Sequence, residues 1–174
     1  MKRRTVVLGA MSAAAVATGV GTALWRARPD DAGREEAPDV WTLSFATVDG
    51  PPLPMSGLRG KRVLVNFWAT WCPPCVTEMP LLDRFARDQS SAGWSVLALA
   101  IDGAEPVRRF IAERGLKLPV ALAGQDGVDL SRRLGNSAGG LPFSVAFDLG
   151  GVAAQRKLGA LDSDLLQSWV ATIP

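Results

Sequence analysis

One short stretch of the chain constrains its fold more than any other feature. An apolar run at residues 63–68 leads directly into two cysteines that are separated by two residues, Cys72 and Cys75. After the cysteines, apolar side chains recur at helical spacing (Met79, Leu82, Phe85 and Ala86). The pattern predicts a buried strand followed by a helix, with Cys72 at the start of that helix.

The predicted position of Cys72 has a chemical consequence. Unpaired backbone N–H groups and the helix dipole stabilise negative charge at a helix N-terminus, which lowers the pKa of a cysteine placed there. Pro73 and Pro74 suit the first helical turn, where an N–H group has no intrahelical partner. The spacing allows a disulfide across the turn, so a mixed disulfide at one sulfur can be released by the other. We therefore expect a redox-active dithiol.

Two other interpretations of the cysteine pair have to be weighed. Half of a zinc site can look like this, but tetrahedral zinc needs four ligands, and the chain has no histidine and no third cysteine. A purely structural disulfide is the other alternative. It would close a very short loop, and the stabilisation from a disulfide grows with loop length. Both alternatives are therefore less favoured than a redox role.

Composition narrows the function classes further. The absence of histidine excludes Ser-His and Cys-His catalysis. With only two cysteines, the chain has no second dithiol to relay electrons, so electrons enter and leave through Cys72 and Cys75. Basic and acidic residues are nearly balanced after residue 40, so no nucleic-acid surface is indicated. We expect no metal and no cofactor other than the Cys72–Cys75 disulfide.

The first 29 residues are typical of a signal or membrane anchor. Lys2, Arg3 and Arg4 precede a run without charge that ends at Arg26. Residues 6–25 are long enough to span a bilayer core of about 30 Å, and the basic start places the body of the protein outside the cytoplasm. We favour an uncleaved inner-membrane anchor. The alternative is a cleaved export signal, with twin-arginine character at Arg3-Arg4, that would leave a soluble periplasmic protein.

The remainder divides into a tether and one domain. Residues 30–39 are polar and charged and predict a flexible tether, and residues 40–174 predict a folded domain. Residues 40–53 predict a hairpin around Asp49-Gly50, with Trp41, Leu43 and Phe45 on one side of its first strand. Further strands are expected at residues 94–101, 119–123, 143–147 and 152–158. Helices are expected after Asp102, with Gly115 just past the end of that helix, around residues 128–134 and after a capping Asp162. The order predicts an α/β fold with a mixed sheet.

Two motifs resemble one known family. They are residues 60–80, which include Val65-Asn66-Phe67-Trp68-Ala69-Thr70-Trp71-Cys72-Pro73-Pro74-Cys75, and the later Gly140-Leu141-Pro142-Phe143-Ser144. Together they resemble the TlpA/ResA-like membrane-anchored thiol-disulfide oxidoreductases of the thioredoxin superfamily. The resemblance implies a thioredoxin fold, with a central mixed sheet flanked by helices, an added N-terminal β-hairpin and a central helix–strand insertion.

The resemblance also implies site residues. Pro142 would be a cis-proline facing the dithiol, and the backbone of Leu141 would then pair with an extended client segment. Glu78 follows Cys75 by three residues on the same helix face, and a buried carboxyl there can take the proton of Cys75. Ordinary thioredoxins carry a buried aspartate where this chain has Asn66. We also expect Trp71, Pro73 and Pro74 to contact the client, whereas Trp68 is equally compatible with core and client contact.

The expected activity is reduction of client-protein disulfides outside the cytoplasm, of the kind used in cytochrome c or copper-oxidase assembly. A membrane thiol-disulfide protein would re-reduce Cys72 and Cys75, and we expect a monomer. The alternatives are a disulfide-donating oxidase of the same fold, because the motif does not fix the reduction potential, and a Cu(I)-transferring chaperone, because two thiolates can hold Cu(I). A peroxidase is disfavoured because Ala69 stands where peroxiredoxins have threonine.

Overall fold

The computed structural model describes residues 40–174. The predicted signal or anchor (1–29) and the predicted tether (30–39) lie outside the described residues. Among the helices between Val40 and Pro174, none combines the length and the hydropathy that a membrane span requires.

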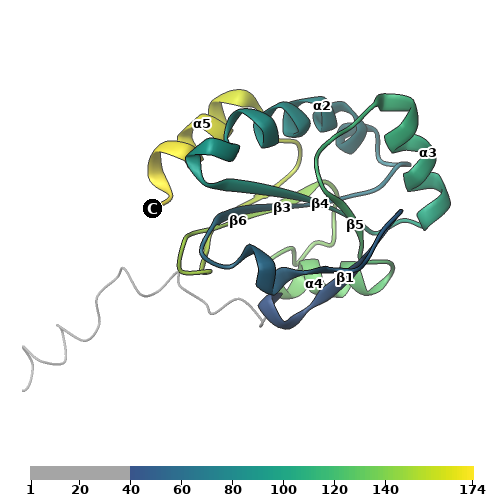
Figure 1. The fold of residues 1–174 in the computed structure, drawn as a ribbon, viewed down its shortest axis with the longest axis horizontal. Coiled ribbons are helices and arrows are strands. Elements are labelled where there is room, and N and C mark those ends of the chain that lie inside the picture. Colours follow the sequence, from purple (N-terminus) through teal and green to yellow (C-terminus); the bar gives the residue numbers. More distant parts are fainter. Residues whose placement is uncertain (1–39) are drawn as a thin grey trace, which may run out of the picture. The chain divides into compact units, whose positions relative to one another are not determined.

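Seven strands form the mixed sheet at the centre of the domain (Figure 1). In chain order they are β1 (Ser44–Thr47), β2 (Leu53–Pro54), β3 (Arg62–Trp68), β4 (Trp94–Ala100), β5 (Val120–Leu122), β6 (Phe143–Phe147) and β7 (Ala153–Leu158). The spatial order is β2-β1-β5-β4-β3-β6-β7, in which β3, β4 and β5 run parallel and the other neighbours are antiparallel. Since β3 and β4 are interior strands covered on both faces, they carry apolar residues on both faces rather than in alternation, apart from Arg62, Asn66 and Ser95.

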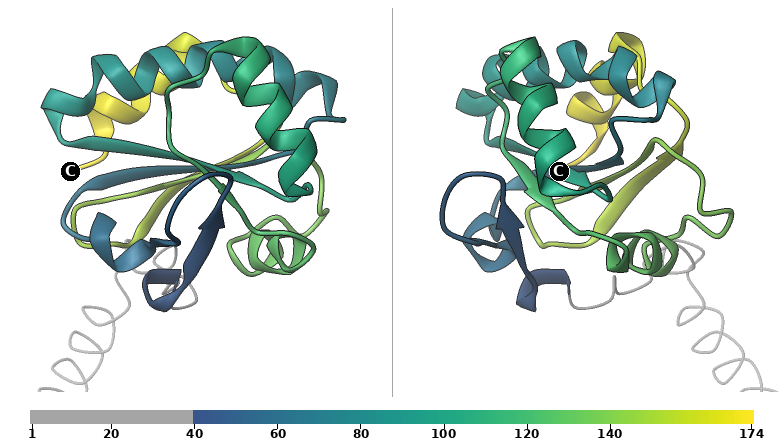
Figure 2. Two further views of the ribbon diagram at one scale, coloured as in Figure 1. Left: turned by 45° about the vertical axis from the view of Figure 1, so that its right-hand side comes forward. Right: turned by 90° about the vertical axis from the view of Figure 1, so that its right-hand side faces the viewer.

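Helices cover both faces of this sheet. They are α2 (Pro73–Asp88), α3 (Ala104–Arg114), α4 (Asp126–Arg133) and α5 (Ser163–Thr172). The views agree that α2, α3 and α5 lie on one face and α4 on the other (Figures 1 and 2). Successive side chains of a strand point to opposite faces, so β3 supplies both cores: Leu64 and Trp68 pack in the first, and Val65 and Phe67 in the second. The predicted mixed α/β sheet is confirmed, and α3 with β5 forms the helix–strand segment between β4 and α4.

Helix ends follow the predicted signals. The Asp162 carboxylate accepts a hydrogen bond from the backbone N–H of Leu165 at 2.8 Å and caps α5. Gly115 ends α3 with φ +63°, in the left-handed region that glycine adopts without strain.

The prediction for Trp41 and Leu43 was wrong. Both were expected on the first strand of the hairpin, but Val40–Thr42 forms a 3₁₀ turn, η2, and β1 starts only at Ser44, after Leu43. The indole explains this: its Nε1 donates to the carbonyl of Gly151 at 3.0 Å, and its ring packs edge-on against Phe147 at 5.2 Å. These long-range contacts bury Trp41 on the α4 side of the sheet and override the local alternation.

Candidate active site

The two cysteines lie where β3 gives way to α2. The strand ends at Trp68, and Cys72 is the N-cap residue of the helix, with extended backbone angles. Its Sγ accepts a hydrogen bond from the backbone N–H of Cys75 at 3.3 Å, and Pro73 and Pro74 occupy the first two helical positions. This is the predicted junction, in which one sulfur faces the unpaired N–H groups of a helix terminus.

Cys72 and Cys75 are joined by a disulfide with a Cα–Cα distance of 5.3 Å. The two residues differ in accessibility, since Cys72 is 5% exposed and Cys75 is completely buried. A protein disulfide that approaches from solvent therefore meets Cys72, and Cys75 lies behind it. No group of three or more histidine, cysteine, aspartate or glutamate side chains that could hold a metal ion occurs within residues 40–174.

The aromatic residues on either side of the motif have different environments. Trp71 is 66% exposed, the most accessible large hydrophobic side chain in the described part of the chain. Trp68 is fully buried and packs against Phe110 at a ring-centroid distance of 5.1 Å, so it belongs to the core. Pro73 and Pro74 are both exposed. Of the two tryptophans, only Trp71 is therefore available to a client.

A second loop approaches the end of β3. Its Leu141–Pro142 peptide bond is cis, as the resemblance implies, and Leu141 is partly exposed. The loop leads directly into β6, whose first residue, Phe143, is paired with Phe67 near the end of β3. Two hydrogen bonds hold this loop in place. The carbonyl of Pro142 accepts from the N–H of Gly159 at 2.9 Å, and the side-chain amide of Asn136 donates to the carbonyl of Gly140 at 2.9 Å.

Sequence reasoning missed one residue that positions the motif. The carboxylate of Asp102, just beyond β4, accepts hydrogen bonds from both the backbone N–H of Thr70, at 2.8 Å, and its hydroxyl group. Because β3 and β4 are parallel and adjacent, their carboxyl ends lie at the same edge of the sheet. In the sequence, the position of Asp102 at the end of an apolar run indicated only that a strand stops there, and its role follows from the pairing of β3 with β4.

Glu78 lies inside the domain rather than on the surface. It is 4% exposed, and its two carboxylate oxygens have different partners. Oε1 accepts from the side-chain amide of Asn66 at 2.8 Å, and Oε2 accepts from the backbone N–H of Leu161 at 2.7 Å. The same Asn66 nitrogen donates to the hydroxyl of Ser144 at 2.9 Å. A polar network thus links α2 to β3, to β6 and to the segment before α5.

Burial raises the pKa of Glu78 above its ordinary value of 4.5, while the hydrogen bonds from Leu161 and Asn66 partly offset that rise. A buried carboxyl with a raised pKa can change its protonation state at a pH where exposed carboxylates stay ionised. The helix pattern alone left Glu78 equally compatible with an exposed position, and the family resemblance favoured a buried carboxyl that accepts a proton. Neither indicated that Asn66 and Leu161 would hold the carboxylate.

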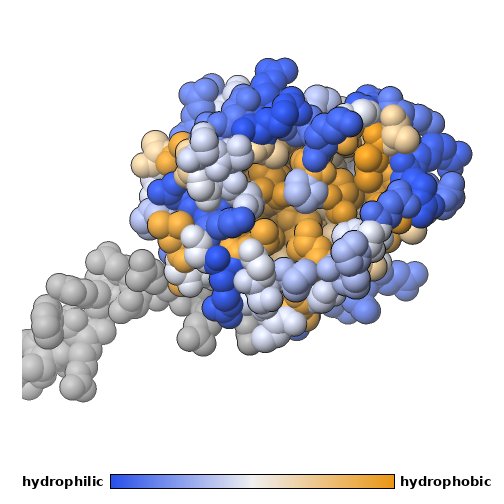
Figure 3. All heavy atoms as spheres, in the orientation of Figure 1, coloured by the Kyte–Doolittle hydropathy of each residue, from blue (hydrophilic) through white to orange (hydrophobic). Residues whose placement is uncertain are grey.

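An apolar groove lies beside the amino end of β5. The dithiol lies at the opposite edge of the sheet, because it follows the carboxyl end of the parallel strand β3. Figure 3 shows hydrophobic side chains gathered in a hollow beside α3. This groove has a volume of about 440 Å³, and its apolar lining residues are Val48, Pro51, Leu53, Ile111, Ala112, Leu118, Pro119 and Val120.

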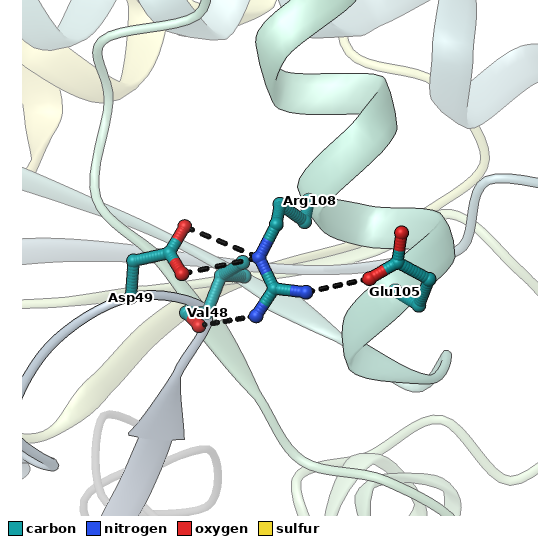
Figure 4. Close-up of polar contacts among 4 residues, drawn as sticks. All are labelled: Val48, Asp49, Glu105 and Arg108. Carbon is teal, nitrogen blue, oxygen red and sulfur yellow. Dashed lines mark hydrogen bonds and ion pairs between the residues drawn. The ribbon is translucent and has the colours of Figure 1, made fainter.

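Arg108 lies at the rim of this groove and joins α3 to the loop after β1 (Figure 4). Its guanidinium donates to the Asp49 carboxylate at 3.1 Å, to the Glu105 carboxylate at 2.6 Å and to the carbonyl of Val48 at 3.0 Å. The side chains of Arg108 and Asp49 are 43% and 72% exposed, so this cluster is solvated.

Comparisons with known proteins agree with this geometry. The Redoxin family model matches residues 32–171. The chain is 30% identical over 140 residues to the thiol-disulfide oxidoreductase ResA of Bacillus thuringiensis, covering 80% of this chain and 77% of that protein.

The chain is also similar to solved structures of thioredoxin-like proteins. The thioredoxin-family thiol:disulfide interchange protein of Chlorobium tepidum has a TM-score of 0.65 and 29% identity, covering 75% of this chain and 92% of that one. StoA of Bacillus subtilis, at 21% identity, shares the fold with a TM-score of 0.60 over 73% of this chain and 94% of its own. This chain therefore belongs to the redoxin family, as a thiol-disulfide oxidoreductase of the ResA type.

Proposed function

We propose that the protein reduces disulfides of client proteins outside the cytoplasm. The observation that carries the proposal is the asymmetry of the pair: Cys72 is the N-cap residue of a helix and retains slight exposure, and Cys75 is completely buried. A thiolate is the attacking species in disulfide exchange, and a helix N-terminus favours that form. Cys72 is accordingly the attacking residue and Cys75 the resolving residue.

The reaction proceeds in two exchanges. The Cys72 thiolate attacks one sulfur of the client disulfide, which forms a mixed disulfide and releases the other client sulfur as a thiolate that takes up a proton from solvent. The Cys75 thiol gives its proton to the Glu78 carboxylate, and the resulting thiolate attacks the Cys72 sulfur. The Cys72–Cys75 disulfide forms, and the second client sulfur leaves and takes up a proton. Two electrons have then passed from this protein to the client.

The client is held by groups around the pair. Exposed Trp71, Pro73 and Pro74 offer an apolar surface next to Cys72, and the partly exposed Leu141 offers backbone to an extended client segment. Proteins of cytochrome c or copper-oxidase assembly are the clients we expect. A membrane thiol-disulfide protein would return two electrons to the disulfide, and residues 6–25 would hold the protein at that membrane as a monomer.

Trapping tests this proposal most sharply. Cys75→Ser removes the resolving sulfur, so the client should stay covalently attached to Cys72 and appear as a species that is lost on addition of dithiothreitol. Cys72→Ser is the matched control and should trap nothing and reduce no insulin disulfide. Trapping through Cys75 in the Cys72→Ser variant would contradict the assignment of the two sulfurs.

The direction of electron flow is set by the reduction potential. Equilibration of the Cys72–Cys75 pair with glutathione buffers measures it. A value near that of thioredoxin, about −270 mV, supports a reductase, and a value near about −120 mV would instead identify a disulfide-donating oxidase.

A further inference from the structure

The buried amide of Asn66 has an unusual set of partners. Its nitrogen, Nδ2, donates to Glu78 Oε1 at 2.8 Å and to Ser144 Oγ at 2.9 Å, which uses both of its N–H groups. Its oxygen, Oδ1, is buried, and no donor of residues 40–174 reaches it. Buried polar atoms nearly always have a hydrogen-bond partner. An unpaired amide oxygen on a side chain that contacts an ionisable carboxyl therefore needs a physical explanation.

The two oxygens of Glu78 are not equivalent as proton acceptors. Oε2 is held by the backbone N–H of Leu161 at 2.7 Å, a donor that cannot become an acceptor. Within residues 40–174, the hydrogen-bond partner of Oε1 is the side-chain amide of Asn66. A proton that reaches the carboxylate therefore resides on Oε1, where in the present orientation it would face the amide N–H groups, donor against donor.

Rotation of the amide by half a turn removes this conflict. Oδ1 then takes the place of Nδ2 and can accept from the Glu78 carboxyl O–H and from the Ser144 hydroxyl, which is able to donate as well as to accept. We propose that Asn66 is a positioning residue that turns between two orientations, donating to the Glu78 carboxylate and accepting from the protonated carboxyl. No backbone atom has to move.

The surroundings of Glu78 leave this role to Asn66. Glu78 shares a face of α2 with Cys75. It contacts the Asn66 side chain on β3, which in turn contacts Ser144 on β6. In the segment before α5 it contacts the backbone of Leu161. The neighbouring ionisable residues on the elements packed around it are Lys157, paired with Ser144 across β6 and β7, and Asp162, which follows Leu161. Both are exposed to solvent.

For catalysis the consequence rests on the proposed function. When Cys75 releases its proton to Oε1, the turned amide of Asn66 holds that proton during the attack of the Cys75 sulfur on Cys72. When the proton leaves to solvent, the amide turns back and stabilises the carboxylate. Glu78 thus keeps a hydrogen-bond partner on Oε1 in both protonation states, although it is buried.

Nuclear magnetic resonance of the full-length, disulfide-bonded protein tests the switch without any client. The Glu78 carboxyl carbon and the Asn66 side-chain amide should titrate with one midpoint, and nuclear Overhauser contacts from the Asn66 amide protons to the Ser144 β protons should vanish as Glu78 becomes protonated. Asn136 is an internal control: its Oδ1 is also buried without a donor in the described chain, but its amide contacts Ser131 and Gly140, which do not titrate. Persistence of the Asn66–Ser144 contacts through the Glu78 titration would overturn the proposal.

Two variants sharpen the test. Glu78→Gln can accept from Leu161 and donate to Asn66, so it should lock the turned amide at every pH, and an unturned amide there would contradict the switch. Asn66→Leu should raise the midpoint of the Glu78 titration by only about one pH unit, because it removes a hydrogen bond to the charged carboxylate and a weaker one from the neutral carboxyl. Asn136→Leu, whatever it does to stability, should leave that midpoint in place. Since these readouts use oxidised protein, failure of insulin reduction would sink the proposed function but not the switch.

Discussion

Two carboxylates in this fold connect separate elements through hydrogen bonds, but in opposite surroundings. Glu78 is 4% exposed and connects α2 with β3 and with the segment before α5, whereas the Asp49 side chain is 72% exposed and connects the loop after β1 with α3 through Arg108. Because the groups around Glu78 are buried away from water, a donor that loses its hydrogen bond to Glu78 has no water to replace it, which costs stability. Solvent around Arg108 screens its ion pairs and replaces them when they break. We therefore expect burial, rather than the number of contacts, to decide which cluster contributes more to the free energy of unfolding.

Removing the buried carboxylate should have the largest effect. Glu78→Leu leaves the backbone N–H of Leu161 and one N–H of Asn66 without a partner inside the protein. We expect the free energy of unfolding to fall by about 2 to 3 kcal/mol, measured by urea denaturation of the oxidised protein. Glu78→Gln is the matched control, because its amide oxygen can accept from Leu161 and its amide nitrogen can donate to Oδ1 of the turned Asn66 side chain; it should lose less than about 1 kcal/mol. Equal losses in the two variants would show that the polar pairing is not what stabilises this region.

A smaller effect is expected from pH. Burial raises the pKa of folded Glu78 above 4.5, its ordinary and unfolded value, so the folded protein binds this proton more tightly. The resulting stabilisation is fully present below pH 4.5 and is lost as the pH rises through the folded pKa, by about 1.4 kcal/mol for each unit that the two pKa values differ.

The difference in unfolding free energy between wild type and Glu78→Gln isolates this contribution. Going upward from pH 4.5, wild type should lose stability relative to the variant. Parallel stability curves would indicate that Glu78 titrates alike in the folded and unfolded states, and a relative gain by wild type would mean that its pKa is lowered.

The exposed cluster should give the smallest effect. Arg108→Ala breaks the contacts to Asp49, Glu105 and the carbonyl of Val48, yet solvated ion pairs of this kind contribute little to stability, so the free energy of unfolding should fall less than in Glu78→Leu. The loss should shrink further at high salt, because added ions screen exposed charges. A loss as large as that of Glu78→Leu, unchanged by salt, would remove the distinction between the two regions.

The same contrast explains how far the sequence could be interpreted. The junction of β3 and α2 was predictable because its signals are local: an apolar run, a Cys-x-x-Cys spacing and prolines suited to a first helical turn. The caps at Asp162 and Gly115 were local as well. These features depend on residues that are close in the sequence, so they could be predicted from the sequence alone.

Features that depend on distant partners were missed. Trp41 lies in a 3₁₀ turn because its indole reaches Gly151, which is 110 residues away. Asp102 holds the loop before Cys72 through Thr70, which becomes clear only once β3 and β4 are known to be adjacent and parallel. Likewise Asn66 was noted only for lacking the carboxylate of ordinary thioredoxins, because its contacts with Glu78 and Ser144 join three elements.

The position of Cys72 at the start of α2 is the foundation of the proposed chemistry, and its ionisation can be measured directly. The rate at which iodoacetamide alkylates Cys72 in the reduced Cys75→Ser variant should be recorded against pH. We predict an inflection clearly below about 8.5, the ordinary value for a free cysteine, because the helix terminus stabilises the thiolate. An inflection at or above that value would contradict the account.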